Sequence, residues 1–198
     1  LSRLRIQNQA LVELACYRQV HQDDLDQMLT KITETVSCTL QVARGSIWLY
    51  QAAQLILLDL YEPSLNRHSY EINLPEFELG TLNPTLESLG DLLAHKLGFL
   101  NSEDLKNLPA PLDSSRLEVP IRLEGQIRGI LCLESVAPNR QWTLDEQNFV
   151  TAIADLISLA WEVEERKQTE AILRKYERIV SATPDQISLL DRSYIYQV

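Results

Sequence analysis

Cysteine and glycine are both scarce in this chain of 198 residues, which holds three cysteines and six glycines. Cys16, Cys38 and Cys132 lie far apart and form no CxxC pair, so neither a disulfide framework nor a zinc site is indicated. Cys132 lies in an apolar run and the other two lie in helical patterns, so all three are expected to pack in the core. This usage is typical of a reducing compartment, and we expect a cytoplasmic location.

Long apolar runs and an excess of positive charge are also missing. No stretch approaches the ~18 residues of a membrane span, and residues 1–5 lead into polar sequence rather than a signal peptide. Eighteen basic against 28 acidic residues leave a net charge of −10, which repels phosphate groups. We therefore expect no membrane insertion of this segment and no nucleic-acid partner.

The groups that enzyme chemistry needs are few and isolated. His21, His68 and His95 make no HxxxH or HxH spacing, so no metal site is indicated. No motif joins a cysteine to a histidine, and the scattered glycines form no phosphate-binding loop. We predict no catalytic residue, no metal and no enzyme activity for this chain. Because it begins without methionine and ends in a strand-like run at residues 194–198, we expect it to be part of a longer protein.

The apolar pattern of the first part of the chain predicts two helices followed by three strands. Apolar residues recur with a helical period over the first forty residues, with a polar break at residues 21–24. The period then changes to two. Residues 46–50 (SIWLY) and 55–61 (LILLDLY) predict a β-hairpin, and residues 68–73 predict a third strand with His68 and Tyr70 on one face.

A second hairpin is predicted near the middle of the chain. Residues 75–113 are mixed, with plausible helices over 84–96 and 101–106. Residues 117–123 and 127–134 are strand-like and flank a turn in which Gly125 can supply a positive φ, while Pro120 indicates a sheet edge or a bulge. Two hairpins with helices before, between and after them predict an α+β fold, an antiparallel β-sheet with helices packed against it.

One long helix is predicted from Thr143, which forms a capping box with Glu146. A helix of about 36–40 residues rises about 55–60 Å, which is longer than a small domain is wide. We therefore expect its second half to leave the globule and to form a parallel homodimer. The predicted dimer residues have the alternating four- and three-residue spacing of a coiled-coil seam: Phe149, Ile153, Leu156, Ala160 and Val163.

Six motifs stand in a characteristic order: RGSIWLY (44–50), LDLYEPS (58–64), RHS (67–69), VPIR (119–122), GILCLE (129–134) and RQWTLDEQNF (140–149). Together they resemble a GAF domain of the bacterial sensor type, found in histidine kinases and diguanylate cyclases. The sequence from Tyr176 to Arg192 is similar to the opening helix and first strand of a PAS domain. The resemblance implies a GAF-like domain at 1–165, a linker helix at 166–182 and the truncated start of a PAS domain at 183–198.

The resemblance implies a cytoplasmic, non-catalytic sensory or transmission domain of a multidomain kinase or cyclase, usually a homodimer. Covalent bilin carriers of this family have a linking cysteine between the third strand and the last hairpin. This chain has none between Cys38 and Cys132, so no covalent bilin and no other cofactor is expected. Asn139–Arg140 and Asp145–Glu146 resemble pieces of the family's cyclic-nucleotide signature, but their compressed spacing favours a turn and a helix cap.

A ligand pocket is expected on one face of the sheet, under residues 75–113. Trp48, Tyr61, His68 and Tyr70 are its candidate lining residues, since amphipathic side chains beside an apolar cavity are typical of ligand sites. The alternative is that these side chains fill the core. Two hypotheses for function therefore stay open. Either an unknown small molecule binds and biases the exit helix, or the chain is a purely structural dimerisation and relay module without a ligand.

Overall fold

The computed structural model describes residues 2–20, 24–51, 54–70, 115–135, 137, 139–182, 189–190 and 196–197. The expectations for residues 75–113 lie outside the described residues. The chain divides into two compact units, Leu1–Glu162 and Val163–Val198, which are described separately below.

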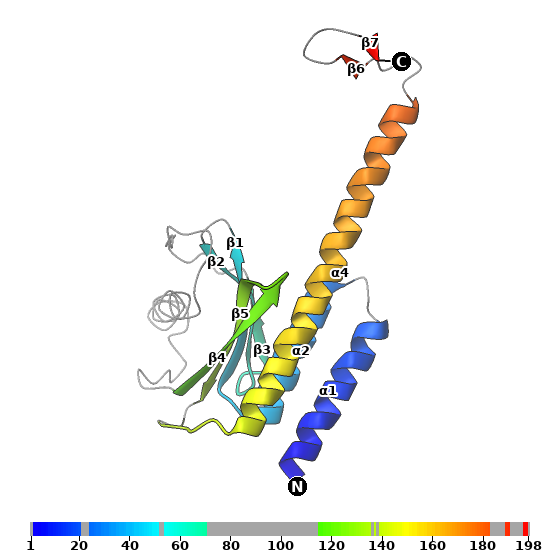
Figure 1. Cartoon of the computed structure of the whole chain (residues 1–198). Coiled ribbons are helices and arrows are strands. Elements are labelled where there is room, and N and C mark those ends of the chain that lie inside the picture. The colour runs from blue at the N-terminus through cyan, green and yellow to red at the C-terminus, as the bar shows by residue number, and fades with distance from the viewer. Residues whose placement is uncertain are drawn as a thin grey trace. The chain divides into compact units, whose positions relative to one another are not determined.

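An antiparallel five-stranded sheet forms the centre of the first unit, in the order β3-β2-β1-β5-β4 (Figure 1). β1 (Arg44–Gln51) and β2 (Gln54–Glu62) form the first predicted hairpin, and β3 (Arg67–Ser69) pairs with β2. β4 (Ser115–Leu123) and β5 (Gln126–Ser135) form the second, which joins β1 through β5. Both predicted hairpins and the α+β class are thus confirmed, and Pro120 lies on an edge strand.

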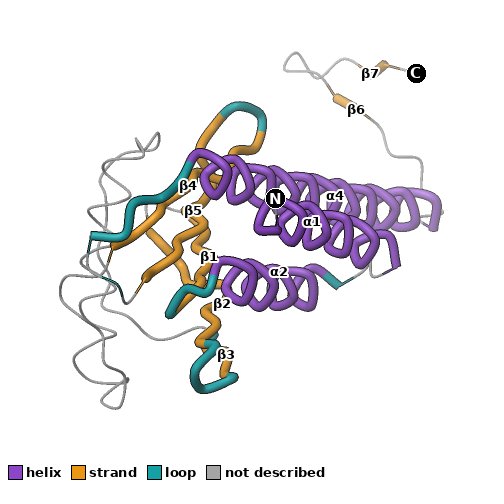
Figure 2. Tube along the Cα trace, turned by 90° about the horizontal axis from the view of Figure 1, so that it is seen from below, coloured by secondary structure: helices purple, strands orange, loops and turns teal. Residues whose placement is uncertain are grey.

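Three helices lie side by side on one face of this sheet (Figures 1 and 2). They are α1 (Ser2–Val20), α2 (Leu25–Leu40) and the first part of α4 (Leu144–Ala182). The Asp24 carboxylate accepts the Gln27 N–H at 2.9 Å and so caps α2. The predicted capping box starts α4: Thr143 Oγ1 accepts the Glu146 N–H at 3.3 Å, and the Glu146 carboxylate accepts the Thr143 N–H at 2.9 Å.

Two glycines show which side of the central strands meets the helices. A Cβ at Gly45 would lie against Ser37 and Thr33 of α2, and one at Gly129 would lie against Trp161 of α4. Alternation along β1 therefore directs Gly45 and its odd-numbered neighbours toward the helices, the helix face of the sheet. Trp48 and the other even-numbered residues of β1 lie on the opposite face.

A β-bulge in β2 changes which of its residues share a face with β1. Trp48 pairs with Leu57, whereas Ile47 pairs with Asp59, so Leu58 is an extra residue in β2. Asp59 consequently lies on the helix face with Ile47. Tyr61 does so too, because it pairs with Gly45.

A row of alternating charges crosses the opposite face at one end of the sheet. The strand pairings place these residues in the order Arg67, Glu62, Arg44, Glu134 and Arg116. Arg67 Nη2 lies 3.0 Å from Glu62 Oε2, and Arg44 Nε lies 2.6 Å from Glu134 Oε2. The row lets buried carboxylates face guanidinium groups, which offsets the cost of removing these charges from water.

The second unit contains the distal part of α4 and a short hairpin. α4 is one helix of 39 residues, so the predicted long exit helix is confirmed. β6 (Leu189–Leu190) pairs antiparallel with β7 (Tyr196–Gln197). Within the described ranges, no helix is both long and apolar enough to cross a bilayer.

Candidate functional site

A cleft of about 700 Å³ lies beside the N-terminal half of α2, and we call it the Tyr70 cleft. Ile56 and Leu58 of β2 supply apolar lining. The polar and aromatic lining residues are Tyr17, Asp24, Asp26, Gln27, Thr30, Lys31, Glu34 and Tyr70. The described lining residues carry three carboxylates against one ammonium group, which gives this part of the cleft a negative potential.

A second cleft of about 490 Å³ lies between α1, α2 and the β2–β3 turn. Glu13, Cys38, Tyr61 and Asn66 contribute to its walls. Lys31 and Glu34 line both clefts, so these two side chains of α2 stand between them.

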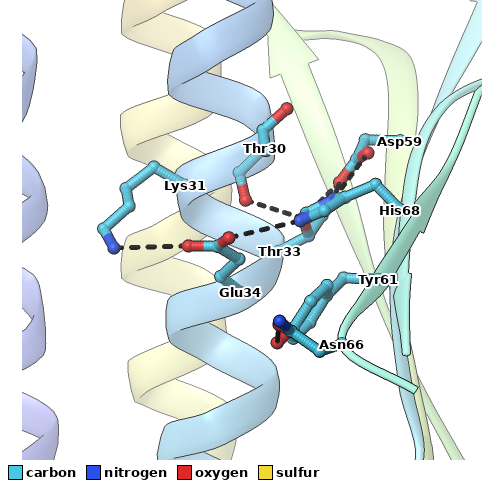
Figure 3. A network of polar contacts seen from close by, with 8 residues as sticks. All are labelled: Thr30, Lys31, Thr33, Glu34, Asp59, Tyr61, Asn66 and His68. Carbon is cyan, nitrogen blue, oxygen red and sulfur yellow. Dashed lines mark hydrogen bonds and ion pairs between the residues drawn. The ribbon is translucent and has the colours of Figure 1, made fainter. Parts of the chain in front are cut away.

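A polar network, the His68 network, joins α2 to the sheet edge between these clefts (Figure 3). His68 Nδ1 lies 3.0 and 3.1 Å from the two carboxylate oxygens of Asp59, and Nε2 lies 3.3 Å from Glu34 Oε1. Lys31 Nζ pairs with the other oxygen of Glu34 at 3.3 Å. The Thr33 hydroxyl donates to Asp59 Oδ2. Three elements, α2, β2 and β3, are thus linked through one imidazole ring.

The electrostatics of the network are dominated by the burial of Asp59, whose side chain is 1% exposed. Burial raises the pKa of Asp59, and the nearby Glu34 carboxylate acts in the same direction. The hydrogen bonds from Thr33 and His68 and the charge of His68 partly oppose this shift. The site can therefore hold a proton between an acid and a base. Across the described part of the chain, no group of three His, Cys, Asp or Glu residues is arranged to hold a metal ion.

Tyrosines flank His68 on both sides. The ring of Tyr61 lies 4.6 Å from the imidazole, and the Tyr70 ring stacks on it at 6.0 Å with an interplanar angle of 8°. Burial raises the pKa of Tyr61, whose hydroxyl donates to Asn66 Oδ1 at 2.9 Å. Tyr70 is 54% exposed and borders the cleft, so this aromatic stack runs from the core to a solvent-accessible wall.

Comparison with known proteins identifies the family. Residues 24–161 match the sequence profile of the GAF domain. The chain belongs to the GAF domain family. No curated protein matches this GAF chain.

Solved structures share the fold at low sequence identity. The GAF domain of an Acinetobacter phosphoenolpyruvate-protein phosphotransferase is 15% identical with a TM-score of 0.56, and the match covers 84% of this chain and 95% of that domain's chain. Free methionine-R-sulfoxide reductase from Neisseria meningitidis, solved with its substrate, is 11% identical with a TM-score of 0.55 (83% and 93% covered). The phycoerythrobilin-bound GAF domain of a cyanobacterial phytochrome is 16% identical with a TM-score of 0.53 (82% and 97% covered). At these identities the likeness shows the fold alone.

The structure brings three of the four predicted pocket residues of this GAF domain together. Tyr61, His68 and Tyr70 form the aromatic stack on the helix face. Trp48 is fully buried on the opposite face, where its Nε1–H donates to Ser46 Oγ at 2.9 Å. Trp48 lines neither of the two clefts described above, and ligand binding by these four residues stays a prediction.

The sequence analysis did not select the residues that hold His68 in place. Thr33 and Glu34 lie one after the other on α2, and Asp59 lies on β2. A carboxylate inside the apolar run LILLDLY was the available signal, because a buried charge needs a partner.

The predicted dimer residues of α4 divide between two environments. Phe149 and Ile153 are buried in the chain's own core, and Leu156 packs against that core. Ala160 and Val163 are half-buried. The structure therefore leaves only the end of this stripe accessible, and pairing with a second chain stays a prediction.

The three cysteines also have different environments. Cys132 is fully buried, as predicted, and burial raises its pKa well above the usual value. The expectation of core packing for Cys16 and Cys38 is wrong, because both thiols are exposed on their helices. Helical spacing placed these two residues in α1 and α2 correctly but did not show which side of each helix they occupy.

Proposed function

We propose that this GAF domain is a non-catalytic sensory and transmission module of a multidomain signalling protein, with the Tyr70 cleft as its ligand site. GAF domains are sensory and regulatory domains of signalling proteins. The observation that carries the proposal is a cleft of about 700 Å³ whose wall residues Glu34 and Tyr70 both contact His68. This volume is within the range of small-molecule sites.

The charge of the cleft indicates the class of ligand. Among the described lining residues, Asp24, Asp26 and Glu34 face a single cation, Lys31, so phosphate-bearing or carboxylate-bearing molecules are repelled. The tyrosine rings of Tyr17 and Tyr70 offer faces that attract cations. We therefore propose a small cationic or neutral ligand for this cleft rather than a cyclic nucleotide.

Helix α2 supplies the path from the cleft to α4. Its outer side carries Lys31 and Glu34 at the cleft. Its inner side places Ile32 and Val36 in the same core cluster as Ile153 of α4. Because a close-packed core transmits displacement, a ligand that shifts α2 would also shift the first part of α4.

The wider context is proposed from the sequence resemblance. A PAS domain would begin near Thr183, and the parent protein would be a cytoplasmic kinase or cyclase. We propose no covalent bilin, since the sequence has no cysteine between Cys38 and Cys132. The phycoerythrobilin of the phytochrome neighbour belongs to that protein.

Binding at the cleft can be tested by NMR titration of the ¹⁵N-labelled chain. The probes are putrescine, spermidine, choline and arginine, with cyclic GMP and citrate as anionic counterparts. We expect a cationic probe to shift the amides of Thr30, Glu34 and Tyr70, and the anions to leave them unchanged. Thr30→Trp, which fills the cleft, should abolish the shifts. Thr151→Trp, on an exposed position of α4, is the matched control. Binding that persists in Thr30→Trp, or shifts caused only by anions, would contradict the proposal.

A second candidate function, a structural dimerisation and relay module without ligand, is favoured by the distal part of α4. Leu173, Tyr176 and Val180 are each more than half exposed and follow a three- and four-residue spacing on one side of the helix, beside Ile172. A lone helix cannot bury such a stripe. We propose that a second copy of the chain covers it in a parallel homodimer, which would place both output domains at the same end.

Sedimentation equilibrium tests the homodimer. The wild-type chain should have twice its mass of 22.7 kDa. Leu173→Glu with Tyr176→Glu should weaken the dimer, whereas Ala171→Glu with Ser181→Glu adds the same charge at exposed positions on the other side of the helix and should not. A wild-type chain that stays monomeric at ~100 μM, where even ~10 μM association shows, would refute the homodimer.

A further inference from the structure

The His68 network contains more contacts than a neutral histidine can satisfy. Both ring nitrogens face carboxylates: Nδ1 lies 3.0 Å from Asp59 Oδ1, and Nε2 lies 3.3 Å from Glu34 Oε1. An ionised carboxylate only accepts hydrogen bonds, and a neutral imidazole has a single N–H. One of the two contacts is therefore repulsive unless the network holds one additional proton.

The neighbouring groups set where this proton can be. The Thr33 hydroxyl has one hydrogen, and both Asp59 Oδ2 and the Thr30 carbonyl lie within its reach. Among the described residues, Lys31 Nζ pairs with Glu34, and its charge favours the ionised form of that carboxylate. The additional proton therefore lies between Asp59 and His68, as imidazolium with carboxylate or as imidazole with carboxylic acid, and it titrates as a property of the pair.

We propose that this shared proton is a latch that ties the sheet edge to α2 and so regulates the Tyr70 cleft. With the proton bound, His68 links β2, β3 and α2. When it is lost, His68 keeps only one carboxylate contact and the other carboxylate is repelled. The released side is free to move together with Tyr70, which stacks on the ring and lines the cleft. This regulatory role rests on the proposed function of that cleft.

The structure supports a latch at this position for two reasons. β3 is a strand of three residues at the edge of the sheet that the described strands form, with β2 as its neighbour there, so side-chain contacts are a large part of what holds it. His68 is also largely buried, with a side chain 14% exposed, so the loss of a hydrogen bond there is not fully replaced by water. Among the described residues, the charged and titratable groups that face the ring are Asp59 and Tyr61 from β2, Glu34 from α2 with its partner Lys31, and Tyr70 after β3.

The direction of the pH effect follows from the proton count. The latch is closed at low pH, where the additional proton is bound, and opens as pH rises through the titration of the pair. The two ends of this change are therefore sampled at an acidic and at a basic pH.

Glu34→Gln is the decisive variant. Its amide can donate to the unprotonated Nε2 while Nδ1–H donates to Asp59, so every contact is satisfied without the additional proton. The variant should keep the link between α2 and β3 but lose its pH dependence. Glu165→Gln, an exposed position of α4, makes the same chemical change away from the network.

The measurement is amide hydrogen exchange of Arg67, His68 and Ser69 in the full chain, without ligand, at pH 6.0 and pH 8.5, corrected for base catalysis. In the wild type and in Glu165→Gln, the corrected rate should rise about 10- to 100-fold at the higher pH, as expected for losing one charge-assisted hydrogen bond. In Glu34→Gln it should change less than about 2-fold.

A wild-type rate that does not change with pH, or a Glu34→Gln variant that changes as much as the wild type, would overturn the latch. No ligand is present in this experiment and no pH change is made in the probe titration. The latch and the ligand site can therefore fail independently.

Discussion

The contact between Gly45 and Ser37 permits a quantitative test of how α2 packs against the sheet. A Cβ added at Gly45 would overlap Ser37 Oγ, whereas its next neighbours, Leu133 Cδ2 and the Thr33 carbonyl, would both be at an ordinary 3.4 Å. Gly45→Ala therefore creates one main clash, and overpacking of this kind costs about 1–3 kcal/mol. Ser37 is fully buried and its hydroxyl has no hydrogen-bond partner among the described groups, so Ser37→Ala should be nearly neutral.

The double variant should recover the stability lost in Gly45→Ala. Without the Ser37 hydroxyl the new methyl group has room, and replacing glycine removes freedom from the unfolded chain. We expect a coupling free energy of about 1–2 kcal/mol between the two positions. In a unit of this size, each kcal/mol lost should lower the melting temperature by about 2–4 °C.

Urea unfolding followed by tryptophan fluorescence suits this measurement, because all three tryptophans lie in the first unit. Gly125→Ala is the control. Its φ of 79° makes alanine strained by about 1 kcal/mol, but nothing surrounds the site, so Ser37→Ala should not rescue it. The reasoning is refuted if Gly45→Ala costs the same with and without Ser37→Ala.

Three further predictions concern the thiols, the start of α4 and the chromophore. In the native chain, maleimide should label Cys16 and Cys38 within minutes and Cys132 only after unfolding; rapid native labelling of Cys132, located by mass spectrometry, would contradict its burial. Burial alone would raise the pKa of Glu146, but hydrogen bonds from Thr143 and the charge of Arg140 outweigh burial, so the pKa is lowered. The stabilisation by the ionised Glu146 carboxylate is therefore present above the pKa of the unfolded chain, and it is lost as pH falls through the lower pKa of the folded chain. In urea unfolding, Glu146→Gln should therefore cost about 1 kcal/mol at pH 7 and progressively less as the pH falls through the folded pKa, and an equal cost at every pH would contradict this. Co-expression with a bilin-producing pathway should give a colourless denatured polypeptide, and a zinc-fluorescent band on a denaturing gel would show covalent attachment.

Features that depend on neighbours in sequence could be predicted from the sequence. The capping box of Thr143 and Glu146 needs residues three apart. The β4–β5 turn needs positive φ, which Glu124 and Gly125 adopt at 49° and 79°. Alternation of apolar residues gave both hairpins. Each of these signals lies within a few residues, where backbone geometry alone decides which side chains meet.

The grouping of Trp48 with Tyr61 could not be tested by alternation alone. Trp48 pairs with Leu57, and an unbroken period of two would place Tyr61 on the same face as Leu57. The extra residue Leu58 reverses the facing of everything after it. A run of four apolar residues from Leu55 gives no indication of where such a bulge lies, because every position in it tolerates burial.

The seam of α4 shows a related limit. Spacing of four and three residues places Phe149 and Ile153 on one stripe, and that stripe is apolar whether it meets its own sheet or a second chain. The structure assigns both residues to the chain's own core. Whether the stripe meets its own sheet or a second chain depends on where the sheet lies relative to the helix. No pattern of neighbouring residues gives that position.

Asp59 shows how part of such a site can still be inferred. A carboxylate within an apolar strand is costly unless donors meet it, so the sequence predicts that partners exist without naming them. The partners are Thr33, 26 residues earlier, and His68, nine residues later. They meet Asp59 because the bulge turns it toward α2 and because β3 folds back on β2. The network therefore depends on the same irregularity that separates Trp48 from Tyr61, and a change that removed Leu58 from β2 would return Asp59 to the face without these donors.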